Sequence, residues 1–165
     1  MKVLQVSAEI FPLLKTGGLA DVAGALPPAL KAVGCDVRVL LPGFAPIMAD
    51  LQNSSLLVEL YAPWGERVAV RRGYLASLDI TAYVIDLPTL YLREGSPYED
   101  AQREPHADNY RRFSLLGWVG ARLANGLDVF WQPQVVHSHD WHAALASAYM
   151  AFSPAQRVRV ANVYT

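Results

Sequence analysis

The sequence has little of three things that mark whole classes of protein: cysteine, long apolar runs and an excess of one charge. Its single cysteine, Cys35, cannot form an intramolecular disulfide, which favours a reducing compartment. No run approaches the roughly 18 apolar residues of a membrane-spanning helix, and Glu9 interrupts the short apolar start, which argues against a secretory signal. With 14 basic and 15 acidic residues, the net charge of −1 offers no electrostatic surface for nucleic acid or anionic lipid. We therefore expect a cytoplasmic protein without nucleic-acid or membrane partners.

What remains is the composition of an ordinary globular protein. Hydrophobic residues make up 53% and charged residues 18% of the 165 positions, and the chain contains no internal repeat or low-complexity segment. A typical domain has about 100–150 residues. The sequence therefore predicts one domain with a substantial core.

The order of apolar patterns predicts an α/β fold. Apolar, β-branched runs at residues 3–7 and 36–41 are typical of buried strands, and the segment 19–26 between them has helical spacing. A strand, a glycine loop, a helix and a second strand in this order indicate a Rossmann-like parallel sheet flanked by helices.

Prolines punctuate the first predicted helix. Pro27 and Pro28 are expected to break or kink it, and residues 29–32 can resume it. Gly34 is the expected C-terminal cap.

The rest of the chain alternates between the two kinds of element. We expect strands at 67–75, 79–86 and 157–165, a strand running into a turn at 135–140, and helices at 108–125 and 141–152. Because the chain stops inside a β-branched run, we expect it to be a fragment of a longer protein.

A glycine pair follows the first predicted strand and opens the first helix. Ligands bind at the carboxyl edge of a parallel sheet, and a helix N-terminus presents unpaired amides and partial positive charge to anions. Gly17 and Gly18 would let a phosphate approach the backbone, and Lys15 would add a full positive charge. The segment is neither a Walker loop nor a dinucleotide fingerprint. On residue types alone, a tight turn with Lys15 in water is an equally good interpretation.

Three histidines and an aspartate crowd around the strand and turn at 135–140. His137 and His139 share one face of the strand, Asp140 follows at its end, and His142 lies in the first turn of the next helix. One interpretation is a metal site; another is a sugar site in which Asp140 and His142 bind hydroxyls and Trp141 stacks on a sugar face. The third is structural, with Asp140 capping the helix beside buried neutral histidines.

Tyr98 is a weaker candidate. It follows a Gly-Ser-Pro turn that can present an aromatic ring to a ligand, although a half-buried structural tyrosine is the more usual outcome.

Together these segments resemble a known family. Residues 7–22 (SAEIFPLLKTGGLADV) resemble the N-terminal signature of bacterial glycogen synthases and plant starch synthases. The likeness continues in order along the whole chain, through residues 25–27 (ALP), 38–42 (RVLLP), 95–98 (GSPY), 115–118 (LLGW) and 135–142 (VVHSHDWH).

The resemblance implies a retaining glycosyltransferase of the GT-B architecture, in which two Rossmann-like domains face a deep cleft. Such an enzyme moves glucose from ADP-glucose to the non-reducing end of an α-1,4-glucan and uses no metal or other cofactor. Residues 1–165 would be the N-terminal, acceptor-side domain. The C-terminal nucleotide-binding domain would be absent, and the fragment alone is expected to be inactive.

The resemblance also implies roles for individual residues. Lys15 would contact the diphosphate region of ADP-glucose, with the amides of Gly17 and Gly18 completing the cradle. Acidic side chains of the family's cleft correspond to Asp21 and Asp140, which we assign as catalytic. The sugar region would be lined by Tyr98, Trp141 and His142.

Three alternatives remain open at this stage. One is another GT-B transferase, with a UDP-sugar donor and a small acceptor. The second is a metal-dependent hydrolase built on His137, His139 and His142. The third is a domain that only binds glucan or a partner.

Overall fold

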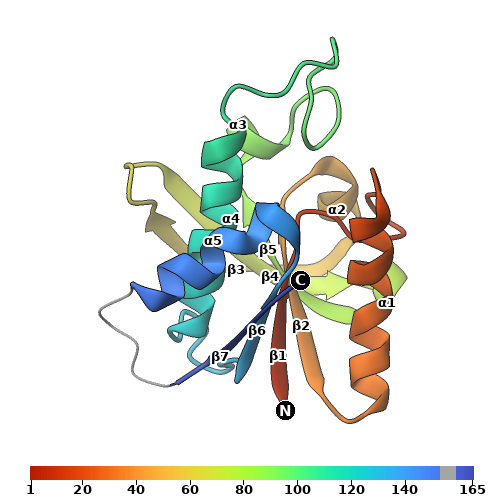
Figure 1. The fold of residues 1–165 in the computed structure, drawn as a ribbon, viewed down its shortest axis with the longest axis vertical. Coiled ribbons are helices and arrows are strands. Elements are labelled where there is room, and N and C mark those ends of the chain that lie inside the picture. The colour runs from red at the N-terminus through yellow and green to blue at the C-terminus, as the bar shows by residue number, and fades with distance from the viewer. Residues whose placement is uncertain (153–158) are drawn as a thin grey trace.

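A computed structural model describes residues 1–152 and 159–165 of the chain. These residues form a seven-stranded sheet in the order β3-β4-β5-β2-β1-β6-β7, with helices on both faces (Figure 1). The elements are β1 (Lys2–Val6), α1 (Gly18–Ala32), β2 (Asp36–Pro42), α2 (Ala45–Asp50), β3 (Leu51–Tyr61), β4 (Arg67–Leu75), η1 (Ala76–Leu78), β5 (Ile80–Asp86), α3 (Pro88–Tyr91), α4 (Asn109–Ala124), β6 (Val135–Ser138), α5 (Asp140–Ala151) and β7 (Ala161–Tyr164).

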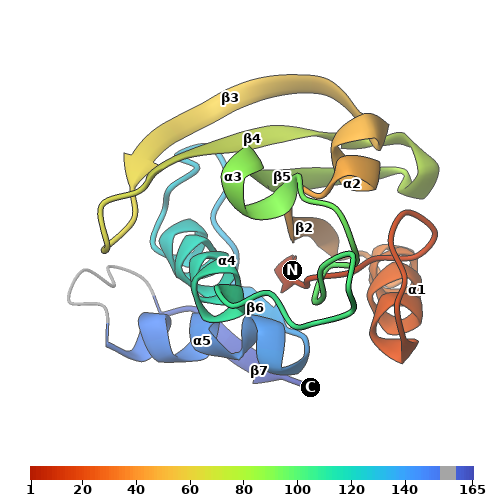
Figure 2. The same ribbon diagram turned by 90° about the horizontal axis from the view of Figure 1, so that it is seen from above.

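The parallel half of the sheet follows the predicted α/β plan. Strands β5, β2, β1, β6 and β7 are parallel neighbours. Viewed from above, α1 lies on one side of the sheet and α4 and α5 on the other (Figure 2). The chain leaves β1 toward β2 and later enters β6 on the opposite side of β1, so the strand order reverses at β1. Ligands bind outside the carboxyl ends of strands at such a switch point.

The other half of the sheet departs from a purely parallel arrangement. Strands β3, β4 and β5 pair antiparallel. The cause is the length of the connections, because a short link between adjacent strands can only form a hairpin, whereas a parallel pair needs a long crossover. Only η1 and Asp79 join β4 to β5. The sequence predicted β4, β5 and their short connection but not β3, and the sheet is mixed.

The first helix corrects one prediction and confirms another. Helix α1 runs without a break through Pro27 and Pro28. A proline keeps a helical φ, and burial of Ala20, Ala23 and Pro27 on one face offsets the missing backbone hydrogen bonds. Gly34 ends the helix as predicted, since its φ of +83° lies in the left-handed region that favours glycine.

Helices α4 and α5 form a closely packed pair over the sheet. Helix α4 lies one residue inside the predicted limits at each end, and Gly126 ends it with a φ of +87°. The predicted strand at 157–165 is observed as β7; residues 157–158 lie outside the described residues. In the described part of the chain, no helix has the length and apolar character needed to cross a membrane.

Candidate active site

The candidate site lies where the segments after β1 and β6 meet. These strands are adjacent and parallel, with Val6 opposite Ser138. The backbone amide of His139 donates to the carbonyl of Val6 over 3.0 Å. A cavity of about 310 Å³ opens at this edge, between the start of α1 and the end of β6. Its lining residues are Gly18, Leu19, Val22, His139, Asp140, Tyr164 and Thr165.

The glycine segment leaves the start of α1 open. Gly17 is the N-cap residue in an extended conformation, and no side chain caps the helix. A Cβ atom at Gly17 or Gly18 would meet no other atom within 4 Å. Neither backbone conformation nor packing therefore requires glycine here. What the missing side chains provide is free space in front of the first helical amides, which suits an approaching anion.

Lys15 and Asp21 form an ion pair beside this helix start. The Nζ atom of Lys15 lies 2.7 Å from both carboxylate oxygens of Asp21. About half of each side chain is exposed, at 46% and 51% respectively. An exposed pair of this kind contributes about 0–1 kcal/mol, so Lys15 can exchange Asp21 for another anion at little cost in free energy.

Asp140 occupies a strained position at the first turn of α5. Its φ is +59°, a left-handed conformation that is uncommon outside glycine. Its amide donates to the Thr165 carbonyl over 2.6 Å, and its carboxylate accepts from the Trp141 amide over 2.6 Å. Such strain concentrates at functional sites because the surrounding structure must hold it. Asp140 is one of the residues that line the cavity, and its side chain is half-exposed.

His137 and His139 share one face, as predicted from strand periodicity. Their rings stack with centroids 4.2 Å apart, and the Thr165 hydroxyl lies within hydrogen-bond distance of both. Burial, and secondarily the neighbouring ring of His137, lowers the pKa of His139 to about 4. Burial also lowers the pKa of His137. Both imidazoles are therefore neutral at pH 7.

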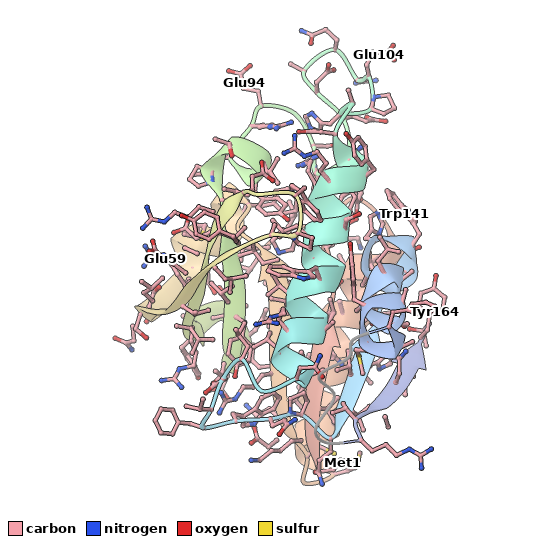
Figure 3. All side chains as sticks on the ribbon, turned by 90° about the vertical axis from the view of Figure 1, so that its left-hand side faces the viewer. Met1, Glu59, Glu94, Glu104, Trp141 and Tyr164 are labelled. Atoms are coloured by element: carbon pink, nitrogen blue, oxygen red, sulfur yellow. The ribbon has the colours of Figure 1, made fainter. Side chains whose placement is uncertain are left out.

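His142 does not join this pair but belongs to an aromatic cluster with Tyr98, Phe113 and Trp141. Tyr98 stacks on His142 with centroids 4.6 Å apart, and Trp141 lies 4.0 Å from the same ring. Trp141 is 54% exposed and lies in the half of the molecule away from Met1 (Figure 3). Within this cluster Phe113 and His142 are buried, so the exposed ring of Trp141 is the one that suits stacking on a sugar face.

The histidines therefore give no support to a three-histidine metal site. Within residues 1–152 and 159–165, no group of three His, Cys, Asp or Glu side chains converges as metal ligands must. The predicted binding residues instead form two groups: Lys15 and Asp21 with the glycine amides, and Tyr98 with Trp141 and His142.

Sequence reasoning missed Glu9, whose carboxylate accepts hydrogen bonds from Thr16, which lies between Lys15 and Gly17, and from Tyr98. The available signal was an acidic residue placed directly after a buried strand among apolar neighbours. The side chain is only 2% exposed.

Comparison with known proteins identifies the family to which the chain belongs. The family model described as the starch synthase catalytic domain matches residues 2–165. Curated glycogen synthases from Variovorax paradoxus and Leptothrix cholodnii are 60% and 54% identical over the whole chain, which covers 34% and 35% of their lengths. The chain thus spans about a third of the curated relatives it matches.

The fold is also found among solved structures. The catalytic domain of Starch Synthase IV from Arabidopsis thaliana, bound to ADP and acarbose, matches with a TM-score of 0.75 at 24% identity. The match covers 99% of this chain and 32% of that one.

Proposed function

Because this chain belongs to the starch synthase catalytic-domain family, we propose that it forms part of a glycogen synthase. We call the protein that contains this chain and has the length of its relatives the full-length protein. It transfers glucose from ADP-glucose to the non-reducing end of an α-1,4-glucan with retention of configuration. Residues 1–165 are its N-terminal, acceptor-side domain in a GT-B architecture, and a second domain supplies most of the nucleotide site. It acts in the cytoplasm and needs no metal.

The observation that carries this proposal is the meeting of an anion-binding element and an aromatic cluster at one edge of the sheet. Lys15 and the uncapped amides at the start of α1 are the parts needed to hold a diphosphate. Tyr98, Trp141 and His142 are the parts needed to hold a sugar. The two substrates of a glycogen synthase carry these groups: the nucleotide-sugar donor carries the diphosphate, and the glucan acceptor carries sugar rings.

The charge at this edge fits the proposed reaction. As the glycosidic bond to ADP breaks, the reacting sugar becomes oxocarbenium-like and negative charge builds on the departing diphosphate. Lys15, once it exchanges Asp21 for phosphate, stabilises that charge together with the amides of Gly17 and Gly18. Asp21 holds the ammonium group at the helix start until donor binds, and Asp140 presents its carboxylate to the reacting sugar.

Replacing Lys15 tests the proposal directly. In the full-length protein, Lys15→Ala should lower kcat/KM for ADP-glucose roughly tenfold to a hundredfold, because a charged hydrogen bond contributes about 1.5–3 kcal/mol. Initial-rate assays with glycogen as acceptor measure the effect.

The chain offers a matched control at the other end of α1. Lys31 also forms an exposed ion pair, with Asp79 at 3.0 Å, but it lies far from the glycine segment in the same helix. Lys31→Ala should leave the donor kinetics unchanged. If Lys15→Ala matched Lys31→Ala in every kinetic constant, Lys15 would not bind the donor.

A comparison of donors distinguishes this proposal from a transferase that uses UDP-glucose. The full-length protein should transfer glucose from ADP-glucose at a kcat/KM well above that for UDP-glucose when both are assayed side by side. A reversed preference would favour another transferase of the same architecture.

A further inference from the structure

Glu9 has a buried carboxylate, and the groups that donate hydrogen bonds to it are uncharged. It accepts hydrogen bonds from the amide and the hydroxyl of Thr16, each over 2.5 Å, and from the hydroxyl of Tyr98. Among the described residues, no lysine or arginine forms an ion pair with it. An isolated buried carboxylate is strongly unfavourable in free energy. The three donors are therefore what keeps Glu9 stable in place.

The donors come from the two halves of the candidate site. Thr16 lies between Lys15 and Gly17, in the segment that opens α1. Tyr98 lies 89 positions from Glu9 and brings the aromatic cluster with it, because its ring stacks on His142. One carboxylate thus fixes both the anion-binding segment and the aromatic cluster relative to the end of β1.

Other contacts hold these segments less directly. The amide of Phe11 donates to the carbonyl of Ala20 over 3.0 Å, which ties the start of the loop to α1. Ile10 and Leu14 form a bridge within the loop itself. Neither contact reaches Tyr98. The Tyr98 hydroxyl also interacts directly with the Thr16 side chain, and Glu9 accepts hydrogen bonds from both of these hydroxyls and from the Thr16 amide.

We infer that Glu9 is a positioning residue that couples the donor-diphosphate segment to the sugar-binding aromatic cluster. Both carboxylate oxygens are used: one accepts from the Thr16 amide, and the other accepts from two hydroxyls. A glutamine has the same shape but replaces one acceptor by an NH₂ donor. The NH₂ group can still donate to the two hydroxyls, but the negative charge is lost. Each hydrogen bond then becomes a neutral one, about half as strong as a charge-assisted bond, so both links are weakened. This inference rests on the proposed function for its kinetic consequences, but not for its geometry.

Three substitutions in the full-length protein separate the links. Thr16→Val removes one hydroxyl on the diphosphate side and should raise KM for ADP-glucose roughly three- to tenfold. Tyr98→Phe removes only the hydroxyl on the aromatic side and should raise KM for glucan by a similar factor. Glu9→Gln should raise both constants. A change in only one constant, or in neither, would overturn the coupling.

Ser7→Ala is the control for loss of stability alone. Ser7 is buried and donates to the backbone carbonyl of Glu9 over 2.7 Å, without touching the carboxylate. It should lower the unfolding temperature and leave both KM values unchanged. If Glu9→Gln behaved in the same way, its role would be merely structural. Should Glu9→Gln fail to fold, the double variant Thr16→Val/Tyr98→Phe replaces it, with both KM values raised as the expected result.

A measurement without substrate keeps this inference separate from the proposed function. Hydrogen exchange at the Thr16 amide should be at least about tenfold faster in Glu9→Gln than in the parent protein, because the bond from this amide to Glu9 is weakened. Unchanged exchange would overturn the role of Glu9 even in an active glycogen synthase. Faster exchange in a full-length protein that does not use ADP-glucose would support Glu9 while refuting the proposed function.

Discussion

At the scale of single residues, the buried histidines make stability depend on pH. The pKa of His139 is about 4 in the folded protein and about 6.5 in the unfolded chain. Between these values only the unfolded state takes up the proton, so the stabilisation present above pH 6.5 is lost as the pH falls toward 4. The full loss for this group is roughly 3 kcal/mol. His137 and His142, whose pKa values burial also lowers, act in the same direction.

We therefore expect His139→Gln to flatten the pH dependence of unfolding free energy between pH 6.5 and 4.5. Urea unfolding at a series of pH values measures this slope. The lowered pKa values of Asp108 and Asp128 act at more acidic pH and do not interfere in this window. His106→Gln, outside the stacked pair, should retain the slope. A full slope in His139→Gln would show that burial of this imidazole is not its cause.

At the scale of elements, the crossing of α4 and α5 depends on a missing side chain. A Cβ atom at Gly117 would lie 2.7 Å from the backbone nitrogen of Ala146 and 2.9 Å from the carbonyl carbon of Leu145. Backbone atoms inside a helix cannot move aside singly. Any larger residue at this position must therefore separate the two helices, and the first turn of α5 carries Asp140, Trp141 and His142.

Gly117→Ala should destabilise the fold by about 1–3 kcal/mol, the range for overpacking a closely packed interior. Gly120→Ala, one turn along the same helix, is the matched control. A Cβ there would meet only side-chain atoms, at 3.3 Å or more. The better helix propensity of alanine should offset that contact to within about 1 kcal/mol. Equal midpoints for the two variants in urea unfolding would contradict the backbone clash.

The helices and strands also show which structural features the periodicity of apolar residues predicts and which it does not. Helix α4 was predicted to within a residue because its apolar positions repeat with the helical period and a glycine ends it. Helix α1 was predicted to break or kink at Pro27 and Pro28, and it continues because its buried face, not its local sequence, decides the outcome. Strand β4 was predicted in place, but its antiparallel pairing follows from a connection whose geometry only the folded sheet reveals.

At the scale of the whole molecule, residues 1–165 provide one wall of the proposed site. The side chains of Lys15 and Asp21 remain about half exposed, so an anion bound here would still face water. Exposed charges interact weakly in a medium of high dielectric constant. A second surface is needed to exclude water and strengthen these interactions.

The 165-residue chain alone should therefore show no glucose transfer from ADP-glucose to glycogen, whereas the full-length protein should transfer it. Radiolabelled glucose incorporated into glycogen measures both at equal molar concentration. Transfer by the isolated chain at more than about one hundredth of the full-length rate would mean that the second domain contributes less than roughly 3 kcal/mol.

The sequence by itself determined the strands that form the parallel half of the sheet, the helix that opens at the glycine pair, and the shared face of His137 and His139. Each depends on local backbone periodicity, which neighbouring residues are enough to specify. Only the tertiary structure decided that Lys15 pairs with Asp21, that Tyr98 stacks on His142, and that Glu9 holds both groups. Contacts between segments distant in sequence depend on strand order and loop packing, and these are set only when the whole core assembles.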